Sequence, residues 1–201
     1  MAAAISGSTA GRSGGGVYIT YESAQLTLTN STVSGNTAEY DGGAMYTTGS
    51  DSGVSSPTLT NVSFSGNRAA LSGGGMYNDG YLLGVCRPSL TQVSFSSNTA
   101  GVQGGAMFNS GNEGGVSSPS LTNVSFRGNW AGQDGGGMFS ISDYGGETSP
   151  VLTNVLFGGN AAGFHGGAMF NAGFDAGVTN PVLTNVTFGG NAATSYGGAL
   201  Y

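Results

Sequence analysis

Hydrophobic and polar residues alternate in short runs along the whole chain. The segment 57–67 reads Pro-Thr-Leu-Thr-Asn-Val-Ser-Phe-Ser-Gly-Asn, in which Leu59, Val62 and Phe64 are separated by polar residues. Alternation with a period of two is typical of strands that bury one face. A helix is excluded because glycine and β-branched residues dominate and apolar residues do not recur at a spacing of three and four. The pattern predicts short strands.

The same pattern returns every 31 residues. The string Gly-Gly-(Ala/Gly)-(Met/Leu)-(Tyr/Phe) begins at Gly42, Gly73, Gly104, Gly135, Gly166 and Gly197. The string Leu-Thr-(Asn/Gln) begins at Leu28, Leu59, Leu90, Leu121, Leu152 and Leu183. An earlier copy, Gly14 to Tyr18, lies 28 residues before Gly42, so three residues are missing between Tyr18 and Leu28. A period of this length indicates a solenoid.

Each repeat is expected to form one coil of three short strands. Asn61 and Asn67 are the expected corners because asparagine tolerates the left-handed backbone of a tight turn. The third strand is expected at 74–77, and the variable stretch 109–118 and its equivalents are expected to form one loop per coil. Stacked coils would pair at about 4.8 Å, the usual spacing between strands.

Stacking would place each position of the repeat in a column along the rod. The expected inside columns are represented by Leu59, Val62, Phe64, Ala69 and Met76. The column of Asn67 predicts a ladder in which each amide donates to the carbonyl of the next. The paired glycines suit a backbone approach that a Cβ would block. The ladder column consists of Asn36, Asn67, Asn98, Asn129, Asn160 and Asn191.

These strings resemble the repeats of the chlamydial polymorphic outer membrane proteins, which carry a Gly-Gly-Ala-aliphatic string and a Phe-x-x-Asn string. This chain has the first string at 104–107 and the second at Phe64 to Asn67. The resemblance implies an all-β, right-handed parallel β-helix of the pectate-lyase type. We expect one domain, 1–201, of about six to seven coils. Because the chain begins and ends within a repeat, we expect a piece of a longer solenoid or end-to-end association through uncapped coils.

Composition narrows the function. The chain has no lysine, four arginines, ten acidic residues and a net charge of −6. That balance argues against nucleic acid and against an anionic membrane surface. A single cysteine, Cys86, excludes an internal disulfide and a cysteine-based metal cluster. No window is apolar enough to span a bilayer, and residues 1–4 do not begin a signal peptide.

The column that precedes each glycine pair contains the candidate catalytic residues. Asp134 and His165 would be neighbours about 5 Å apart in that column, so an acid–base pair is conceivable. Solvated turn residues are the favoured interpretation, and the sequence predicts no catalytic, cofactor-binding or metal site. The column contains Asp41, Ser72, Gln103, Asp134, His165 and Tyr196.

The loops carry acidic and aromatic residues at matching positions. The acids of alternate coils would lie about 10 Å apart, too far to share one calcium ion, and are interpreted as solubilising charges. Aromatic loop residues could stack on sugars or partners, or pack within their loops. Trp130 is expected to be exposed. The acids are Asp51, Glu113 and Asp175, with Asp143 and Glu147 nearby, and the aromatics are Tyr81, Tyr144 and Phe174.

Two further patterns arise from the repeat itself. Asn61-Val62-Ser63 and three similar sites match the glycosylation acceptor pattern, but the corner asparagines explain the match. Thr29, Thr60 and their equivalents form an outward threonine column, which good strand propensity explains and which ice binding would also use.

The sequence therefore favours a non-catalytic, extracellular or cell-surface module for adhesion, with glycans or cell-surface and matrix proteins as partners. The alternative is a polysaccharide lyase or glycoside hydrolase of the β-helix type, which needs paired carboxylates or their equivalent. A structural solenoid, stacked end to end or binding ice, is the third hypothesis.

Overall fold

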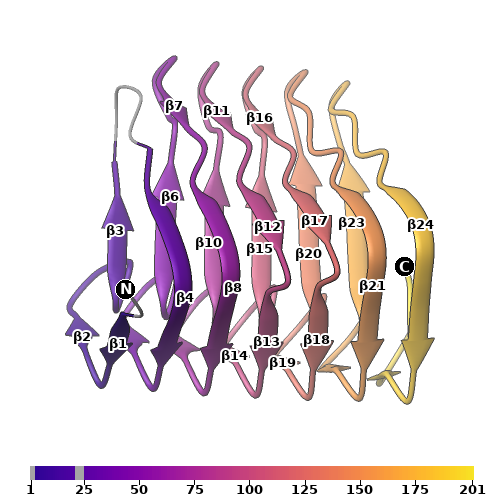
Figure 1. Ribbon diagram of the computed structural model, residues 1–201. Helices are drawn as coiled ribbons and strands as arrows, with labels where there is room; N and C mark the ends of the chain where they lie inside the picture. Colours follow the sequence, from indigo (N-terminus) through magenta and orange to yellow (C-terminus); the bar gives the residue numbers. More distant parts are fainter. Residues whose placement is uncertain (1–2, 21–24) are drawn as a thin grey trace.

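The computed structural model describes residues 3–20 and 25–201, and these form a parallel β-solenoid of about six turns with no helix in the described ranges. Successive coils stack from the N-terminal to the C-terminal end of the rod, and each strand lies beside its equivalent in the next coil (Figure 1). Four sheets run along the rod.

The long sheet carries the alternating Leu-Thr-Asn-Val-Ser-Phe runs. Its strands are β1 (Ala4–Ser6), β4 (Thr27–Ser34), β8 (Thr58–Ser65), β12 (Ser89–Thr91), β13 (Ser94–Ser96), β17 (Ser120–Thr122), β18 (Ser125–Arg127), β21 (Val151–Gly158) and β24 (Val182–Gly189).

The alanine sheet is made of two-residue strands that each end in alanine. They are β2 (Thr9–Ala10), β5 (Thr37–Ala38), β9 (Arg68–Ala69), β14 (Thr99–Ala100), β19 (Trp130–Ala131), β22 (Ala161–Ala162) and β25 (Ala192–Ala193).

The methionine sheet follows the glycine pairs, and a short sheet follows the loops. The methionine sheet contains β3 (Val17–Ile19), β6 (Met45–Thr48), β10 (Met76–Asp79), β15 (Met107–Ser110), β20 (Met138–Ser142) and β23 (Met169–Gly173). The short sheet contains β7 (Val54–Ser55), β11 (Val85–Cys86) and β16 (Val116–Ser117).

The register confirms the 31-residue repeat. In the long sheet Leu59 pairs with Leu90 and Phe64 with Phe95, and in the methionine sheet Met76 pairs with Met107, all in parallel. The early copy is confirmed too, because Val17 pairs with Met45. The interval of the predicted deletion, between Tyr18 and Leu28, includes residues 21–24, which lie outside the described ranges, as do residues 1–2.

The predicted outline of one coil was wrong in two respects. A coil contains up to five strands, because a two-residue alanine strand and a short-sheet strand are added to the three that were expected. In β4, β8, β21 and β24 the first two expected strands run together as one. The second corner is also displaced: Gly66, with φ 61°, makes the left-handed turn, and Asn67 lies buried behind it. The first corner is confirmed, since Asn61 has φ 54° and bends β8 without ending it.

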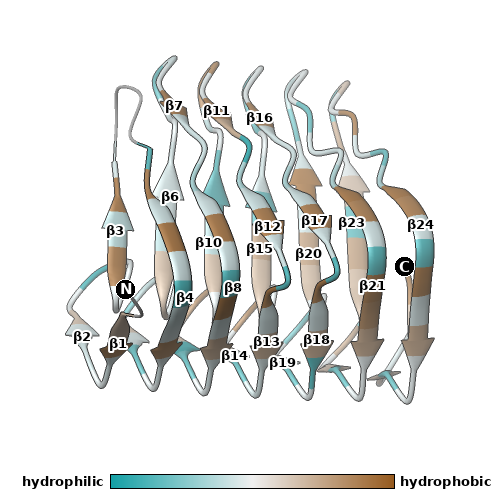
Figure 2. Ribbon diagram, in the orientation of Figure 1, coloured by the Kyte–Doolittle hydropathy of each residue, from teal (hydrophilic) through white to brown (hydrophobic). Residues whose placement is uncertain are grey.

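The predicted inside columns form the core. Leu59, Phe64, Ala69 and Met76 have no exposed surface, and Val62 has almost none. Phenylalanine rings of successive coils stack with centroids 4.6 to 5.2 Å apart. Figure 2 shows the same order in each of the strands β4, β8, β21 and β24, where a hydrophilic band at the asparagine corner separates hydrophobic stretches. Each fully buried large side chain contributes about 1.5–3 kcal/mol before chain entropy is subtracted.

The asparagine ladder is confirmed. From Asn36 to Asn191, each Nδ2 donates to the Oδ1 of the asparagine one coil further on, at 2.9 to 3.0 Å. The backbone N–H of each rung donates to that same oxygen, and Nδ2 also reaches a backbone carbonyl, as Asn98 does to Phe64. Every polar atom of an interior amide is thereby satisfied without water.

The glycine pairs are required by geometry. Gly73 has φ 65°, a conformation that side chains rarely adopt. Gly105 stacks so closely on the next coil that a Cβ would lie 2.6 Å from the carbonyl atoms of Trp130. Neither position accepts a larger residue, so the turn before the methionine sheet has one shape in every coil.

Candidate functional site

The glycine turns present a side of the rod that we call the glycine edge. It consists of the polar column predicted above, an aromatic column on the methionine sheet, and a flanking column one residue before the polar column. Rings of the aromatic column stack with centroids 4.5 to 5.1 Å apart. The aromatic column is Tyr18, Tyr46, Tyr77, Phe108, Phe139, Phe170 and Tyr201, and the flanking column is Arg12, Tyr40, Leu71, Val102, Gln133, Phe164 and Ser195.

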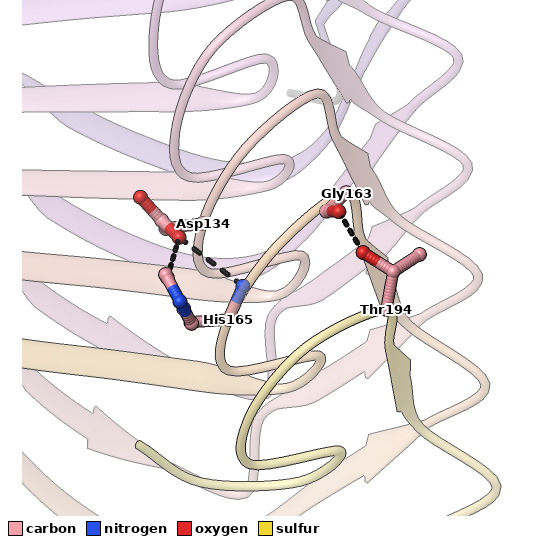
Figure 3. Close-up of polar contacts among 4 residues, drawn as sticks. All are labelled: Asp134, Gly163, His165 and Thr194. Atoms are coloured by element: carbon pink, nitrogen blue, oxygen red, sulfur yellow. Dashed lines mark hydrogen bonds and ion pairs between the residues drawn. The ribbon is translucent and has the colours of Figure 1, made fainter.

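The structure brings Asp134 and His165 together, as the register predicted. The two residues form a parallel bridge, and His165 Nδ1 lies 2.7 Å from Asp134 Oδ1. The same carboxylate oxygen accepts the backbone N–H of His165 at 3.1 Å. Figure 3 shows the two side chains pointing toward one another from adjacent coils, beside the hydrogen bond from Thr194 to the carbonyl of Gly163.

The pair is less solvated than expected. The His165 side chain is 30% exposed and that of Asp134 is 15% exposed. The imidazole stacks on Tyr196, with centroids 5.5 Å apart, and contacts Tyr201 at 5.0 Å. Packing and hydrogen bonding thus orient the ring.

At the N-terminal end of the glycine edge lies a hollow of about 490 Å³. It spans the first two turns, between β2 and β3 in one coil and between β5 and β6 in the next. Of its residues, Asp41 belongs to the polar column, and Tyr18 and Tyr46 belong to the aromatic column. The hollow is lined by Arg12, Ser13, Tyr18, Tyr40, Asp41 and Tyr46.

Two titratable groups of the hollow are shifted by burial. Desolvation raises the pKa of Asp41 above its ordinary value, although the backbone N–H of Ser72, 3.0 Å from Oδ1, partly opposes the shift. Desolvation also raises the pKa of Tyr46, and the carboxylate of Asp79 adds to that effect. The Tyr46 phenol is therefore a neutral hydrogen-bonding group at physiological pH.

Asp79 is a polar centre that the sequence analysis did not single out. Its Oδ2 accepts hydrogen bonds from Tyr46 at 2.9 Å, Ser50 at 3.0 Å and Thr48 at 3.3 Å, while Oδ1 accepts the N–H of Tyr81. The carboxylate thus joins two coils behind the hollow. The sequence did contain a signal for this centre: Asp79 is a charged residue at a position where the other coils carry Thr48, Ser110 and Ile141.

The predicted loop acids lie away from the glycine edge, in the loops that follow the methionine sheet. Asp51, Glu113 and Asp175 occupy left-handed turn positions with φ between 42° and 57°. Glu113 accepts a hydrogen bond from the Tyr81 hydroxyl at 3.1 Å, which raises the pKa of that phenol. Within residues 3–20 and 25–201, no three His, Cys, Asp or Glu side chains are grouped to hold a metal ion.

The predicted loop aromatics are exposed, with Tyr81 at 41%, Tyr144 at 63% and Phe174 at 54%. Trp130 is exposed as expected and lies in the alanine sheet. The glycosylation-pattern residue Asn61 is an exposed corner that donates to Asn30 at 2.8 Å, and the threonine column lies on the outer face of the long sheet. The use of these surfaces stays a prediction.

The C-terminal coil carries both strings that suggested the resemblance, Phe188 to Asn191 and Gly197 to Leu200. Residues 185–201 match the family model of the Chlamydia polymorphic membrane protein repeat. The resemblance is thereby confirmed for this coil. In the coils before it, equivalent strings recur at 31-residue intervals. The winding sense of the solenoid stays a prediction from this likeness.

No match was found among curated proteins or among solved structures. No helix in the described part of the chain is long and apolar enough to cross a membrane. The matched repeat belongs to surface proteins and is not an enzyme family. The comparisons therefore indicate a surface-protein repeat module and leave its ligand open.

Proposed function

We propose that the chain is a non-catalytic, extracellular module that contacts glycans or surface and matrix proteins through side chains outside its solenoid. The observation that carries the proposal is the display of exposed aromatic loop residues on a rigid scaffold. Tyr81, Tyr144 and Phe174 stand out from three coils whose backbones are held in register by parallel pairing. Aromatic side chains on rigid loops are common anchors in binding surfaces.

The polymorphic membrane protein repeat supports the surface location, and the low charge supports contacts other than nucleic acid. In the described coils the interior columns are filled by stacked phenylalanine, leucine and methionine side chains. Recognition would therefore take place on the outside of the coils.

Retention of the purified chain on immobilised polysaccharides, matrix proteins and cells would test the proposal. A variant with Tyr81→Ser, Tyr144→Asn and Phe174→Ser should lose retention at least tenfold; asparagine suits position 144, where φ is 46°. The control changes Thr29, Thr60 and Thr91 to serine on the long sheet and should bind normally. Retention that is equal for all three proteins would contradict the proposal.

A polysaccharide-active enzyme is the second candidate, favoured by the 2.7 Å hydrogen bond between Asp134 and His165. A carboxylate that orients an imidazole is an arrangement used in general base catalysis. Incubation with polysaccharides, with and without calcium, would reveal new chain ends. If the chain cleaves a polysaccharide and Asp134→Ala and His165→Ala abolish the cleavage, the protein is an enzyme and the proposal of an adhesive module is wrong.

A further inference from the structure

We propose that the hollow at the N-terminal end of the glycine edge binds a neutral hexose unit of a glycan. The inference deepens the proposed function, on which it rests for glycan contact, but it assigns a surface different from the loop aromatics. Its residues are the six that line the hollow, led by Arg12, Asp41 and Tyr46.

The hollow has the size of a ligand site. Its volume of about 490 Å³ lies within the range of about 300–1,000 Å³ that is common for small-molecule pockets. Its walls come from two paired coils, since Tyr18 is in register with Tyr46. Parallel pairing and the glycine turns hold these walls in place, so a ligand would meet a preformed surface.

The polar groups of the hollow match a pair of neighbouring sugar hydroxyls. Asp41 Oδ1 is held by the N–H of Ser72, while Oδ2 accepts no hydrogen bond from the described residues. Arg12 makes no ion pair within residues 3–20 and 25–201. A hydroxyl both donates and accepts, so one can donate to the Asp41 carboxylate while its neighbour accepts from the Arg12 guanidinium.

The ring of Tyr40 matches the apolar face of a pyranose ring, because it is 47% exposed in the flanking column. Tyr46 is stacked between Tyr18 and Tyr77, with centroids 5.1 and 5.0 Å away, so it offers the hollow its ring edge and its hydroxyl. Tyrosine presents an apolar ring together with a polar tip. The Tyr46 hydroxyl donates to Asp79 at 2.9 Å, so its oxygen is directed and can still accept from the ligand.

The charges disfavour an anionic sugar. The chain has a net charge of −6, and the carboxylates of Asp41 and Asp79 act on each other electrostatically. A sialylated or sulfated unit would bring further negative charge to a place where these two carboxylates outnumber Arg12. A neutral hexose meets the donors and acceptors without that penalty.

The test uses neutral methyl hexosides and short neutral oligosaccharides in saturation-transfer NMR and calorimetry with the whole chain. Binding is expected with the strongest transfer to the ring protons of one sugar face. Arg12→Ala and Tyr40→Ser should each weaken binding at least tenfold. Arg68→Ala removes an exposed arginine outside the hollow and should change binding less than twofold. Unchanged circular dichroism and melting temperature would show that each variant is folded.

Three results would overturn the inference. One is that none of these sugars binds, and another is that anionic sugars bind equally well. The third is that binding is lost in the loop-aromatic variant but kept in Arg12→Ala and Tyr40→Ser. That last result would support glycan contact by the module while removing it from the hollow, so the two proposals fail separately.

Discussion

The asparagine ladder and the polar column of the glycine edge are both products of stacking at 31-residue intervals, yet they differ in content. In the ladder, the same amide recurs from Asn36 to Asn191 and each rung bonds the next. In the polar column, six positions carry five residue types, and Asp134 and His165 are joined by their side chains. The difference follows from water, which satisfies polar atoms at the edge but is excluded inside.

The comparison indicates where this molecule can vary. An interior rung must both donate and accept along the rod axis, which an amide does in one geometry. An edge position needs no partner in the next coil, so it can carry a carboxylate, an imidazole or a phenol. Function is therefore expected at the edge and in the loops, and stability in the columns inside.

The largest effect is expected from removing one interior rung. Asn98→Ala would leave the backbone N–H of Asn67 without its partner, remove one of the two acceptors of the Asn67 Nδ2, and remove the side-chain donor to the carbonyl of Phe64. Because each buried unpaired group costs about 1–3 kcal/mol, we expect the free energy of unfolding to fall by about 4 kcal/mol in urea denaturation. Asn61→Ala at the exposed corner is the matched control, with a loss of about 1 kcal/mol from the left-handed backbone. An equal loss of unfolding free energy in the two variants would contradict the stated difference between interior and exposed asparagines.

A slightly smaller effect is expected at the close approach of the glycine pair. In Gly105→Ala the added Cβ would meet the backbone of Trp130, whereas in Gly189→Ala it would meet nothing within 4 Å. We expect the first change to destabilise by about 3 kcal/mol, since a backbone cannot move aside without distorting two coils. The second should stay within about 0.5 kcal/mol. Thermal unfolding of both variants would compare them, and a tolerated alanine at 105 would contradict the described contact.

A third comparison concerns a buried titratable group. Burial raises the pKa of Cys86 to about 12 from its ordinary value of 9.0. Because the folded-state pKa is the higher one, this contribution to stability is complete below pH 9 and is lost as the pH rises from 9 through 12. Cys86→Ser matches the serines that occupy the same position in the neighbouring coils. Between pH 8 and pH 10.5 the urea midpoint should fall more for the wild type than for the variant. An equal fall in the two proteins would argue against a buried thiol.

The smallest effect on stability is expected from the edge pair. His165→Ala removes one partly exposed hydrogen bond to Asp134, so the free energy of unfolding should fall by less than about 1 kcal/mol. Gln103→Ala, in the same column, is the control. A loss above 2 kcal/mol in chemical denaturation would show that the pair acts as an interior rung does.

The repeat, the inside columns and the ladder could be predicted from the sequence because they repeat. A position such as Phe64 reveals its burial through its recurrence, without any knowledge of the neighbouring coil. The second corner was harder to predict. Both Asn67 and Gly66 suit a left-handed turn. Gly66 makes the turn because the amide of Asn67 is hydrogen-bonded inside the coil.

The candidate sites were predictable only in part. The register placed His165 beside Asp134, because neighbouring coils differ by a fixed number of residues. The hollow was not predicted, since Arg12 lies in the copy with a 28-residue offset and reaches Tyr40 and Asp41 only through the folded turns. The hydrogen bonds of Asp79 were missed for a similar reason, because they join Tyr46 and Ser50 of the coil before it.

The sequence by itself determined the period, the coil register and the set of buried columns, since one hydrophobic pattern repeated at a constant interval can be buried only by stacking. The tertiary structure alone decided which unlike side chains meet outside. Their contacts depend on turn geometry and on distances across coils, and a linear pattern does not contain those quantities. The hollow, the orientation of the imidazole and the three hydroxyl groups that donate to Asp79 all arise in this way.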